Sequence, residues 1–227
     1  SALQEIAEQH KVDIICLQET HVDKDISSRF TINGFSLLSY HLHPKFGRAT
    51  YINNSLAGAT ASQHNDLWDA CKLDQFSIIN VYKPPSIDWT DSNLPTSLSS
   101  PTIYVGDFNS HHNDWGYESC DENGNKLALW AEANDLVLIH DAKQPGSFHS
   151  ARWGKDYSPD LCFASASIQI SPLVLSPFPH SQHRPVLLSV GLRLPVIHSA
   201  LLNRWNLRTF GRPTGNCSPI NLKQPSQ

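Results

Sequence analysis

The stretch TIYVGDFN, residues 102–109, is an apolar run of strand length that ends in the polar residues Asp107 and Asn109. Other apolar runs carry a polar group at one end in the same way: VDIICLQ before Glu19, DLCFAS beginning at Asp160, and PVLLSVGL after His183. Rigid strands hold functional side chains more firmly than loops do. The sequence therefore predicts a site on the rim of a sheet, built from four strand ends.

The remaining pattern favours a layered α/β sandwich. Further strands are predicted for FSLLSY, ATYIN, FSIINVY, LVLIH and SIQI, and helices for residues 2–10 and 124–135, the second starting at Gly124. Many short strands with two helices, in no regular alternation, fit a sandwich better than a parallel Rossmann sheet. We expect one domain over residues 1–193 and a basic tail or linker over 194–227, partly disordered where Pro, Ser, Asn and Gln dominate.

Composition limits the class of protein. The 227 residues, 40% of them hydrophobic, are enough for a full-sized core. The longest apolar runs are far shorter than the ~18 to 20 residues of a membrane span, and no secretory signal opens the chain. Because the chain has no Met, we expect its natural start to lie upstream. Five widely spaced cysteines indicate reduced thiols and an intracellular protein.

Charge is distributed unevenly along the chain. The formal net charge is -4, yet no Asp or Glu occurs after residue 160. The basic residues of that last part are Arg184, Arg193, Arg204, Arg208, Arg212 and Lys223. An acidic front and a basic end suit a protein that gathers a cation in one place and meets a polyanion in another, although a solvated tail would look the same.

Five segments occur in an order that resembles the endonuclease/exonuclease/phosphatase superfamily. They are CLQETH (16–21), NVYKPPS (80–86), GDFNSHHNDWG (106–116), SPDLCFAS (158–165) and SQHRPV (181–186). The third segment and RWNLR (204–208) are similar in particular to the apurinic-type endonuclease domain of non-LTR retrotransposons. The ordered set, over about residues 1–208, is far more specific than any one motif. The resemblance implies a four-layer sandwich of two mostly antiparallel sheets flanked by helices.

The resemblance implies a role for each strand-end residue. Glu19 matches a ligand of Mg²⁺, for which Mn²⁺ could substitute. Asp107 matches the residue that aligns or deprotonates the attacking water, and Asn109 its partner. His183 matches the histidine at the scissile phosphate, and Asp160 the carboxylate that orients it. These parts suit phosphodiester hydrolysis, since negative charge grows as water attacks the phosphate.

Further candidates carry an open alternative. Tyr82 matches a tyrosine that hydrogen-bonds the phosphate, but aromatic packing would also explain it. His111 and His112 could contact the DNA backbone, or be exposed residues of a turn. Arg184, next to His183, is a predicted DNA contact.

Two features depart from the family pattern. Gln182 stands at a metal-site position where the family has Asp, and a neutral amide binds a hard cation more weakly. The family also has a strand with a metal-site Asn before the first helix, and this chain starts at the helix.

The sequence predicts a Mg²⁺-dependent DNA endonuclease that nicks target DNA for a reverse transcriptase domain of the same polyprotein. A weakened relic that keeps only nucleic-acid binding, and a small-molecule or lipid phosphodiesterase, remain alternatives.

Overall fold

The computed structural model describes residues 2–24, 31–56, 58–177 and 181–192, and the predicted tail lies outside these ranges. The helices are α1 (Ala2–Gln9), α2 (Glu122–Ala133) and the 3₁₀ helix η1 (Asn113–Trp115). The strands are β1 (Ile14–Gln18), β2 (Phe35–His41), β3 (Arg48–Asn53), β4 (Thr60–His64), β5 (Trp68–Lys72), β6 (Ser77–Tyr82), β7 (Thr102–Asp107), β8 (Leu136–Leu138), β9 (Phe148–Ser150), β10 (Lys155–Tyr157), β11 (Asp160–Ser165), β12 (Ile168–Val174) and β13 (Val186–Leu192). No helix in the described ranges is long and apolar enough to cross a membrane.

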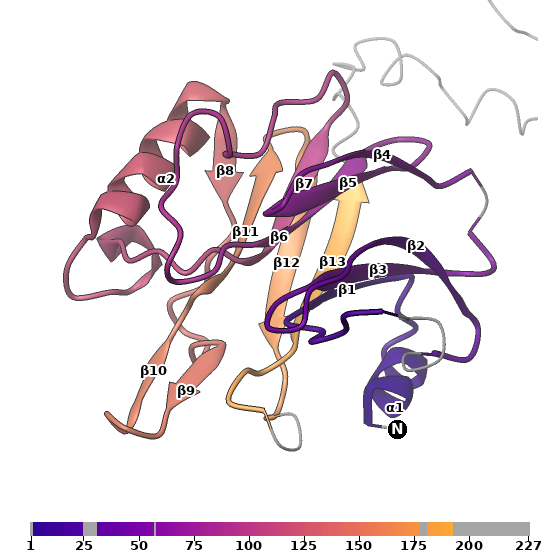
Figure 1. Cartoon of the computed structure of the whole chain (residues 1–227), viewed down its shortest axis with the longest axis horizontal. Helices are drawn as coiled ribbons and strands as arrows, with labels where there is room; N and C mark the ends of the chain where they lie inside the picture. The colour runs from indigo at the N-terminus through magenta and orange to yellow at the C-terminus, as the bar shows by residue number, and fades with distance from the viewer. Residues whose placement is uncertain (1, 25–30, 57, 178–180, 193–227) are drawn as a thin grey trace, which may run out of the picture. The chain divides into compact units, whose positions relative to one another are not determined.

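Two larger sheets form the centre of the domain (Figure 1). One has six strands in the order β4-β5-β6-β7-β11-β8, and the other three in the order β1-β3-β2. Every pairing is antiparallel except that of β6 with β7. The hairpins β9–β10 and β12–β13 pair separately. The predicted α/β sandwich of mostly antiparallel sheets is confirmed.

The core lies in three apolar layers, because residues of opposite parity in a strand face opposite sides of a sheet. On one side of the six-stranded sheet, Ile79 and Tyr104 pack with residues of α2. On the other side, Ile78 and Ile103 pack with residues of β1. A third cluster, which includes Ala7, joins α1 to the three-stranded sheet. The order of layers is therefore helix, sheet, sheet, helix.

Helix α2 begins two residues before the predicted start. Asp121 is its N-cap, and its carboxylate accepts a hydrogen bond of 2.6 Å from the amide of Gly124. Gly124 lies inside the helix. Glycine is needed at this position because a Cβ would come within 1.8 Å of the His111 carbonyl oxygen. The glycine therefore marks a close approach of the helix to the loop after β7, and the prediction that it starts the helix was wrong.

Candidate active site

The centre of the candidate site lies where β7 and β11 run side by side. Asp107, the last residue of β7, is in direct register with Asp160, the first residue of β11. Directly opposed residues of an antiparallel pair project to the same face, so the two carboxylates stand together. On the other side of β7, Gly106 allows β6 to come close, because a Cβ on it would lie 1.9 Å from the Val81 carbonyl oxygen. The sheet itself therefore holds the two acids together.

His183 completes this cluster from the segment before β13. Its Nδ1 lies 2.9 Å from Asp160 Oδ2. One ligand atom each from Asp107, Asp160 and His183 lie within 4.8 Å of one another. Burial lowers the pKa of His183, but the hydrogen bond and the charge of Asp160 outweigh it and raise that pKa to about 9. The imidazole is therefore protonated at neutral pH, and Asp160 orients it through Nδ1.

Asp107 is the buried acid of the cluster. Its exposed fraction is 3%, and burial, followed by the charge of Asp160, raises its pKa to about 7. The backbone amide of Asn109 donates to Asp107 Oδ1 over 3.0 Å. Asn109 has a positive φ of 41°, and its side-chain amide donates to the carbonyl of Lys83. These bonds hold Asn109 beside Asp107, and the predicted roles of both residues stay predictions.

The loop after β7 is fixed by two buried tryptophans. The Trp89 indole donates to Ser110 Oγ over 3.1 Å, and the Trp115 indole donates to the Ser110 carbonyl over 2.8 Å. Ser110 is fully buried, and its hydroxyl donates to the carbonyl of Phe108. The loop that carries Asn109 is thus held by side chains on both sides.

Glu19 lies at the end of β1 and is held by Tyr82. The Tyr82 hydroxyl donates to Glu19 Oε1 over 2.7 Å, and the ring is buried beside Phe46. Burial and Glu19 together raise the pKa of Tyr82. Glu19 has a positive φ of 52°, a backbone conformation that costs a non-glycine residue on the order of 1 kcal/mol. Tyr82 therefore packs and also hydrogen-bonds, but its hydrogen bond goes to the predicted metal ligand.

The remaining predicted residues make contacts within the protein. Gln182 is exposed, and its backbone carbonyl accepts a hydrogen bond from the backbone amide of His149. Arg184 forms an ion pair with Asp156 at 2.8 Å. A separate pair of histidines lies after β7, where His111 stacks on Tyr117 and His112 caps η1 through Nδ1. A contact of Arg184, His111 or His112 with DNA stays a prediction.

Comparison with known proteins agrees with this geometry. Residues 76–187 match the family described as endonuclease-reverse transcriptase. Among solved structures, the endonuclease domain of TRAS1, a telomere-specific non-LTR retrotransposon, is similar with a TM-score of 0.64 at 17% identity, over 86% of this chain and 92% of that one. The chain belongs to the endonuclease/exonuclease/phosphatase superfamily. No curated protein matches it significantly.

Other structures of the superfamily show the same fold at lower identity. A family member from Leptotrichia buccalis has a TM-score of 0.55 at 14% identity, covering 84% of this chain and 91% of that one. A mannosyl-6-phosphatase of Bacteroides thetaiotaomicron has a TM-score of 0.52 at 14% identity, covering 84% and 90%. Proteins named as nucleases and proteins named as phosphatases therefore share this fold.

The donor set of this superfamily member fits a hard divalent cation. Carboxylate oxygens are the ligands that Mg²⁺ prefers, and Glu19 presents a side chain that is 46% exposed beside the buried acids. The negative charges of Asp160 and Glu19 contribute to the raised pKa of Asp107. A cation bound here would oppose that effect, since it favours the ionised carboxylate.

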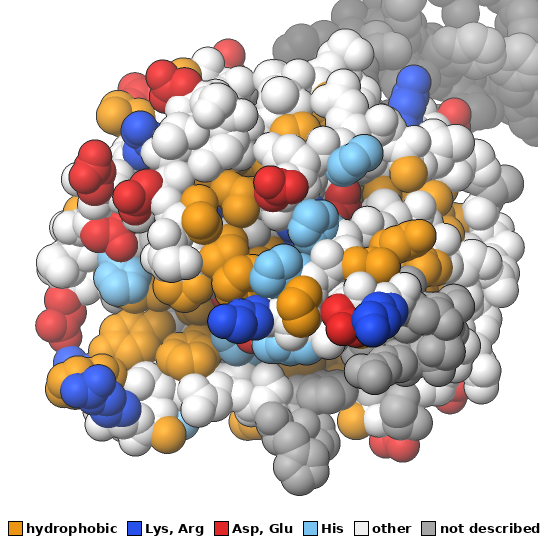
Figure 2. Space-filling model, in the orientation of Figure 1, with side chains coloured by type: hydrophobic (Ala, Val, Ile, Leu, Met, Phe, Trp, Pro, Cys, Tyr) orange, Lys and Arg blue, Asp and Glu red, His pale blue; other side chains and the backbone are white. Residues whose placement is uncertain are grey.

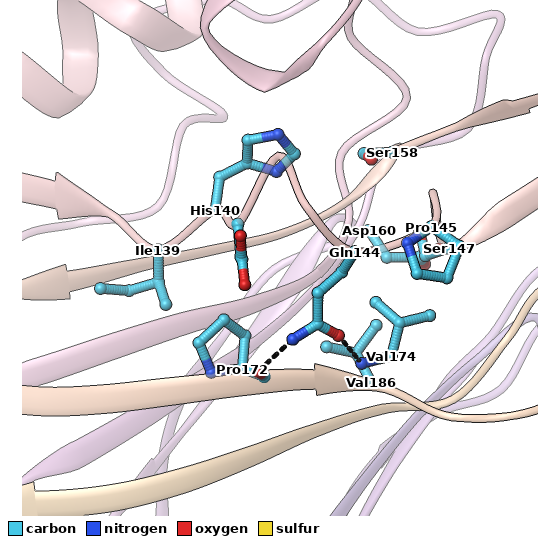
Figure 3. Close-up of a pocket in the computed structure, with 11 residues that line it drawn as sticks. Ile139, His140, Gln144, Pro145, Ser147, Ser158, Asp160, Pro172, Val174 and Val186 are labelled. Atoms are coloured by element: carbon cyan, nitrogen blue, oxygen red, sulfur yellow. Dashed lines mark hydrogen bonds between the residues drawn. The ribbon is translucent and has the colours of Figure 1, made fainter.

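A small cavity lies behind Asp160 (Figure 3). Its volume is about 40 Å³, enough for a single water molecule. Ser147 lines it, and the Ser147 hydroxyl is buried without a hydrogen-bond partner in the protein. Gln144 crosses it between the carbonyl of Pro172 and the amide of Val174. Asp160 lines this cavity, which is too small to hold a nucleotide.

One face of the domain carries mixed charge. On the face drawn in Figure 2, histidines gather near the middle beside hydrophobic side chains, and acidic and basic side chains are interspersed. The β9–β10 hairpin has no counterpart among the predicted strands, and its turn carries Arg152 and Trp153. The Arg152 guanidinium lies 4.9 Å from the centre of the Trp153 ring, and Trp153 is 64% exposed. The dipeptide RW before a glycine was the available signal.

Proposed function

We propose that this chain is a Mg²⁺-dependent DNA endonuclease that hydrolyses a phosphodiester bond to leave a 5′-phosphate and a 3′-hydroxyl. The observation that carries the proposal is the cluster of Asp107, Asp160 and His183, with Asp107 buried, in a chain that matches the endonuclease-reverse transcriptase family. In the proposed context, the 3′-hydroxyl at the nick would prime DNA synthesis by a reverse transcriptase domain of the same polyprotein.

Asp107 and His183 divide the proton chemistry between them. Asp107, buried at the end of β7 and fixed by the Asn109 amide, accepts a proton from the attacking water, and a bound cation keeps its carboxylate ionised for this role. His183, with a pKa of about 9, donates a hydrogen bond to the phosphate as its negative charge grows. Asp160 keeps Nδ1 of His183 occupied, which leaves Nε2 for the substrate.

Glu19 would hold the divalent ion, with the amide oxygen of Gln182 as a weaker second donor. Tyr82 steadies Glu19 through the bond of 2.7 Å. When bound, Mg²⁺ or Mn²⁺ supplies positive charge that stabilises the phosphate oxygens. An amide in place of a carboxylate predicts loose binding of the ion.

DNA would reach the site past the β9–β10 hairpin. An exposed aromatic ring can stack on a base, and an arginine can meet a phosphate. Trp153 and Arg152 offer both at the hairpin turn. The basic residues of the predicted tail would add sequence-independent attraction. The proposed cutting of chromosomal target DNA goes with an intracellular protein that enters the nucleus.

The test is nicking of a supercoiled plasmid with Mg²⁺, with Mn²⁺ and with EDTA, comparing the wild-type chain with Asp107→Asn. We expect an open circular product only with a divalent ion and only from the wild-type chain. Nicking that survives EDTA or the Asp107→Asn change would contradict the proposal.

A phosphatase or small-molecule phosphodiesterase is the second candidate, supported by the structural likeness to a mannosyl-6-phosphatase. It predicts metal-dependent release of phosphate or alcohol from small esters without plasmid nicking. A relic, favoured by Gln182, predicts DNA binding without hydrolysis of either substrate.

A further inference from the structure

The β9–β10 hairpin is attached to the segment that carries His183. Phe148 of β9 forms an antiparallel bridge with His183. The amide of His149 donates to the Gln182 carbonyl over 2.9 Å, and the amide of Arg184 donates to the Ser147 carbonyl over 2.6 Å. The backbone on both sides of His183 is therefore paired to the hairpin, although the hairpin belongs to neither of the larger sheets.

Asp156 of β10 closes this attachment with its side chain. It lies opposite His149 in register, and its Oδ1 is 2.7 Å from His149 Nδ1. Its Oδ2 accepts from Arg184 Nη1 over 2.8 Å, and Arg184 Nη2 lies 3.3 Å from Oδ1. Arg184 also donates to the carbonyl of Gly146. One carboxylate thus joins β10, β9 and the residue after His183.

This ion pair is better shielded than another pair of the same hairpin. The Arg184 side chain is 15% exposed and that of Asp156 31%, whereas Lys155 and Glu118 pair with 57% and 85% exposed. Exposed pairs contribute little, while a two-pronged arginine–carboxylate pair with low exposure fixes geometry. Only the Asp156 pair is therefore expected to restrain the backbone.

We propose that Asp156 and Arg184 are positioning residues that fix the segment 182–184 and thereby aim the His183 ring at the reacting phosphate. The inference rests on the proposed function, in which His183 contacts that phosphate. The ring is held by Asp160 at Nδ1, and it packs on Phe148 with centroids 4.9 Å apart. Loosening the hairpin would shift both the bridge and this ring contact.

A small shift of a catalytic group has a large effect on rate, because a displacement of about 1 Å can cost on the order of 100-fold. Weakening the Asp156–Arg184 ion pair should lower the rate less than removing a catalytic group would. We expect Asp156→Asn to lower kcat about 10-fold. Arg184→Lys keeps the charge but not the planar fork, so its effect should be intermediate.

Two substrates separate positioning from DNA binding. Bis(4-nitrophenyl) phosphate offers the site a phosphodiester without a DNA strand, whereas supercoiled plasmid can also contact the hairpin turn. Asp156→Asn should lower kcat on both in Mg²⁺, with little change of KM on the small ester, while the matched control Glu118→Gln should change neither. If only plasmid nicking fell, the clamp would serve DNA binding and the proposal would be overturned.

Hydrogen exchange supplies a measurement that needs no activity. The amides of Arg184 and His149 donate to backbone carbonyls and should be protected in the wild-type chain. Asp156→Asn should reduce their protection at least about 10-fold while leaving the amides of β7 unchanged, and Glu118→Gln should have no effect.

Unchanged protection in Asp156→Asn would refute the positioning role, whether or not the chain is active. Lost protection in a chain whose wild type hydrolyses neither substrate would refute only the proposed function.

Discussion

The two halves of the site differ in how firmly the fold holds them. Asp107 and Asp160 stand on paired strands in direct register, and the side chain of Asp160 is only 17% exposed. Glu19 stands just beyond the end of its strand, with a positive φ and a side chain that is 46% exposed. The first half is buried and connected by short bonds, whereas the second opens to solvent.

This difference corresponds to two kinds of chemical task. Proton transfer and charge stabilisation need groups held in place before the reaction, since rearrangement during the reaction costs energy. A cation that exchanges with solvent needs an accessible ligand. We therefore expect substitutions in the buried half to reduce the rate at any metal concentration, and substitutions in the open half to change the metal requirement.

The largest effect should come from Asp107→Asn, which removes the proton acceptor. Loss of a general base costs on the order of 100-fold to 10,000-fold in rate. Plasmid nicking at saturating Mg²⁺ measures it. Asp114→Asn, the same change at an exposed position of η1, should leave the rate unchanged. A rate within a few-fold of wild type would exclude Asp107 as the base.

Glu19→Gln should reduce activity by about 100-fold at low Mg²⁺, because metal-mediated charge stabilisation amounts to several kcal/mol. A titration of nicking with Mg²⁺ should show partial recovery at high concentration, unlike Asp107→Asn. Glu5→Gln, at an exposed position of α1, is the matched control. If the loss of activity did not depend on Mg²⁺ concentration, Glu19 would act in the reaction itself and not as a metal ligand.

Gln182→Asp should act in the opposite direction by adding a hard ligand. We expect the Mg²⁺ concentration for half-maximal nicking to fall about 10-fold, a change of about 1.4 kcal/mol in binding free energy. Gln169→Glu adds the same charge at an exposed position of β12 and should not change the requirement. An unaltered titration would mean that residue 182 does not face the ion.

The smallest effect concerns stability without metal. The pKa of Asp107 is raised to about 7 and that of His183 to about 9, each above its value in the unfolded chain. Protons are therefore bound more tightly in the folded state, and stability is lost as pH rises through about 4 to 7 for Asp107 and about 6.5 to 9 for His183. In EDTA at pH 8, Asp107→Asn should raise the melting temperature by a few degrees. A lower melting temperature would contradict the pKa of Asp107.

Much of the buried half could be predicted from the sequence, because apolar strand patterns that end in Asp or begin with Asp specify both where a strand runs and which polar group it delivers. That Asp107 and Asp160 are exact neighbours could not, since register depends on contacts between segments far apart in sequence. The open half was harder, because loops have no such periodicity.

Four strands of the described residues escaped prediction for physical reasons. Strand β4 reads TASQH and is exposed throughout, so it has no apolar alternation. Strand β5 carries Asp69, which is buried because Arg48 Nε donates to Oδ1 over 2.8 Å and the hydroxyls of Ser39 and Thr50 donate to Oδ2. A charge buried by its partner cannot be distinguished in sequence from a charge in solvent. The β9–β10 hairpin, with strands of three residues each, is likewise too short for a periodic signal.

Because Asp107 lies in direct register with Asp160, activity requires that β7 and β11 are correctly aligned. A slip of one residue between β7 and β11 would turn one carboxylate toward the opposite face of the sheet, because side chains alternate. Misaligned molecules could keep much of their secondary structure and still lack a paired acid. The specific activity of a preparation would then measure the fraction of chains that found the correct alignment, which circular dichroism cannot see.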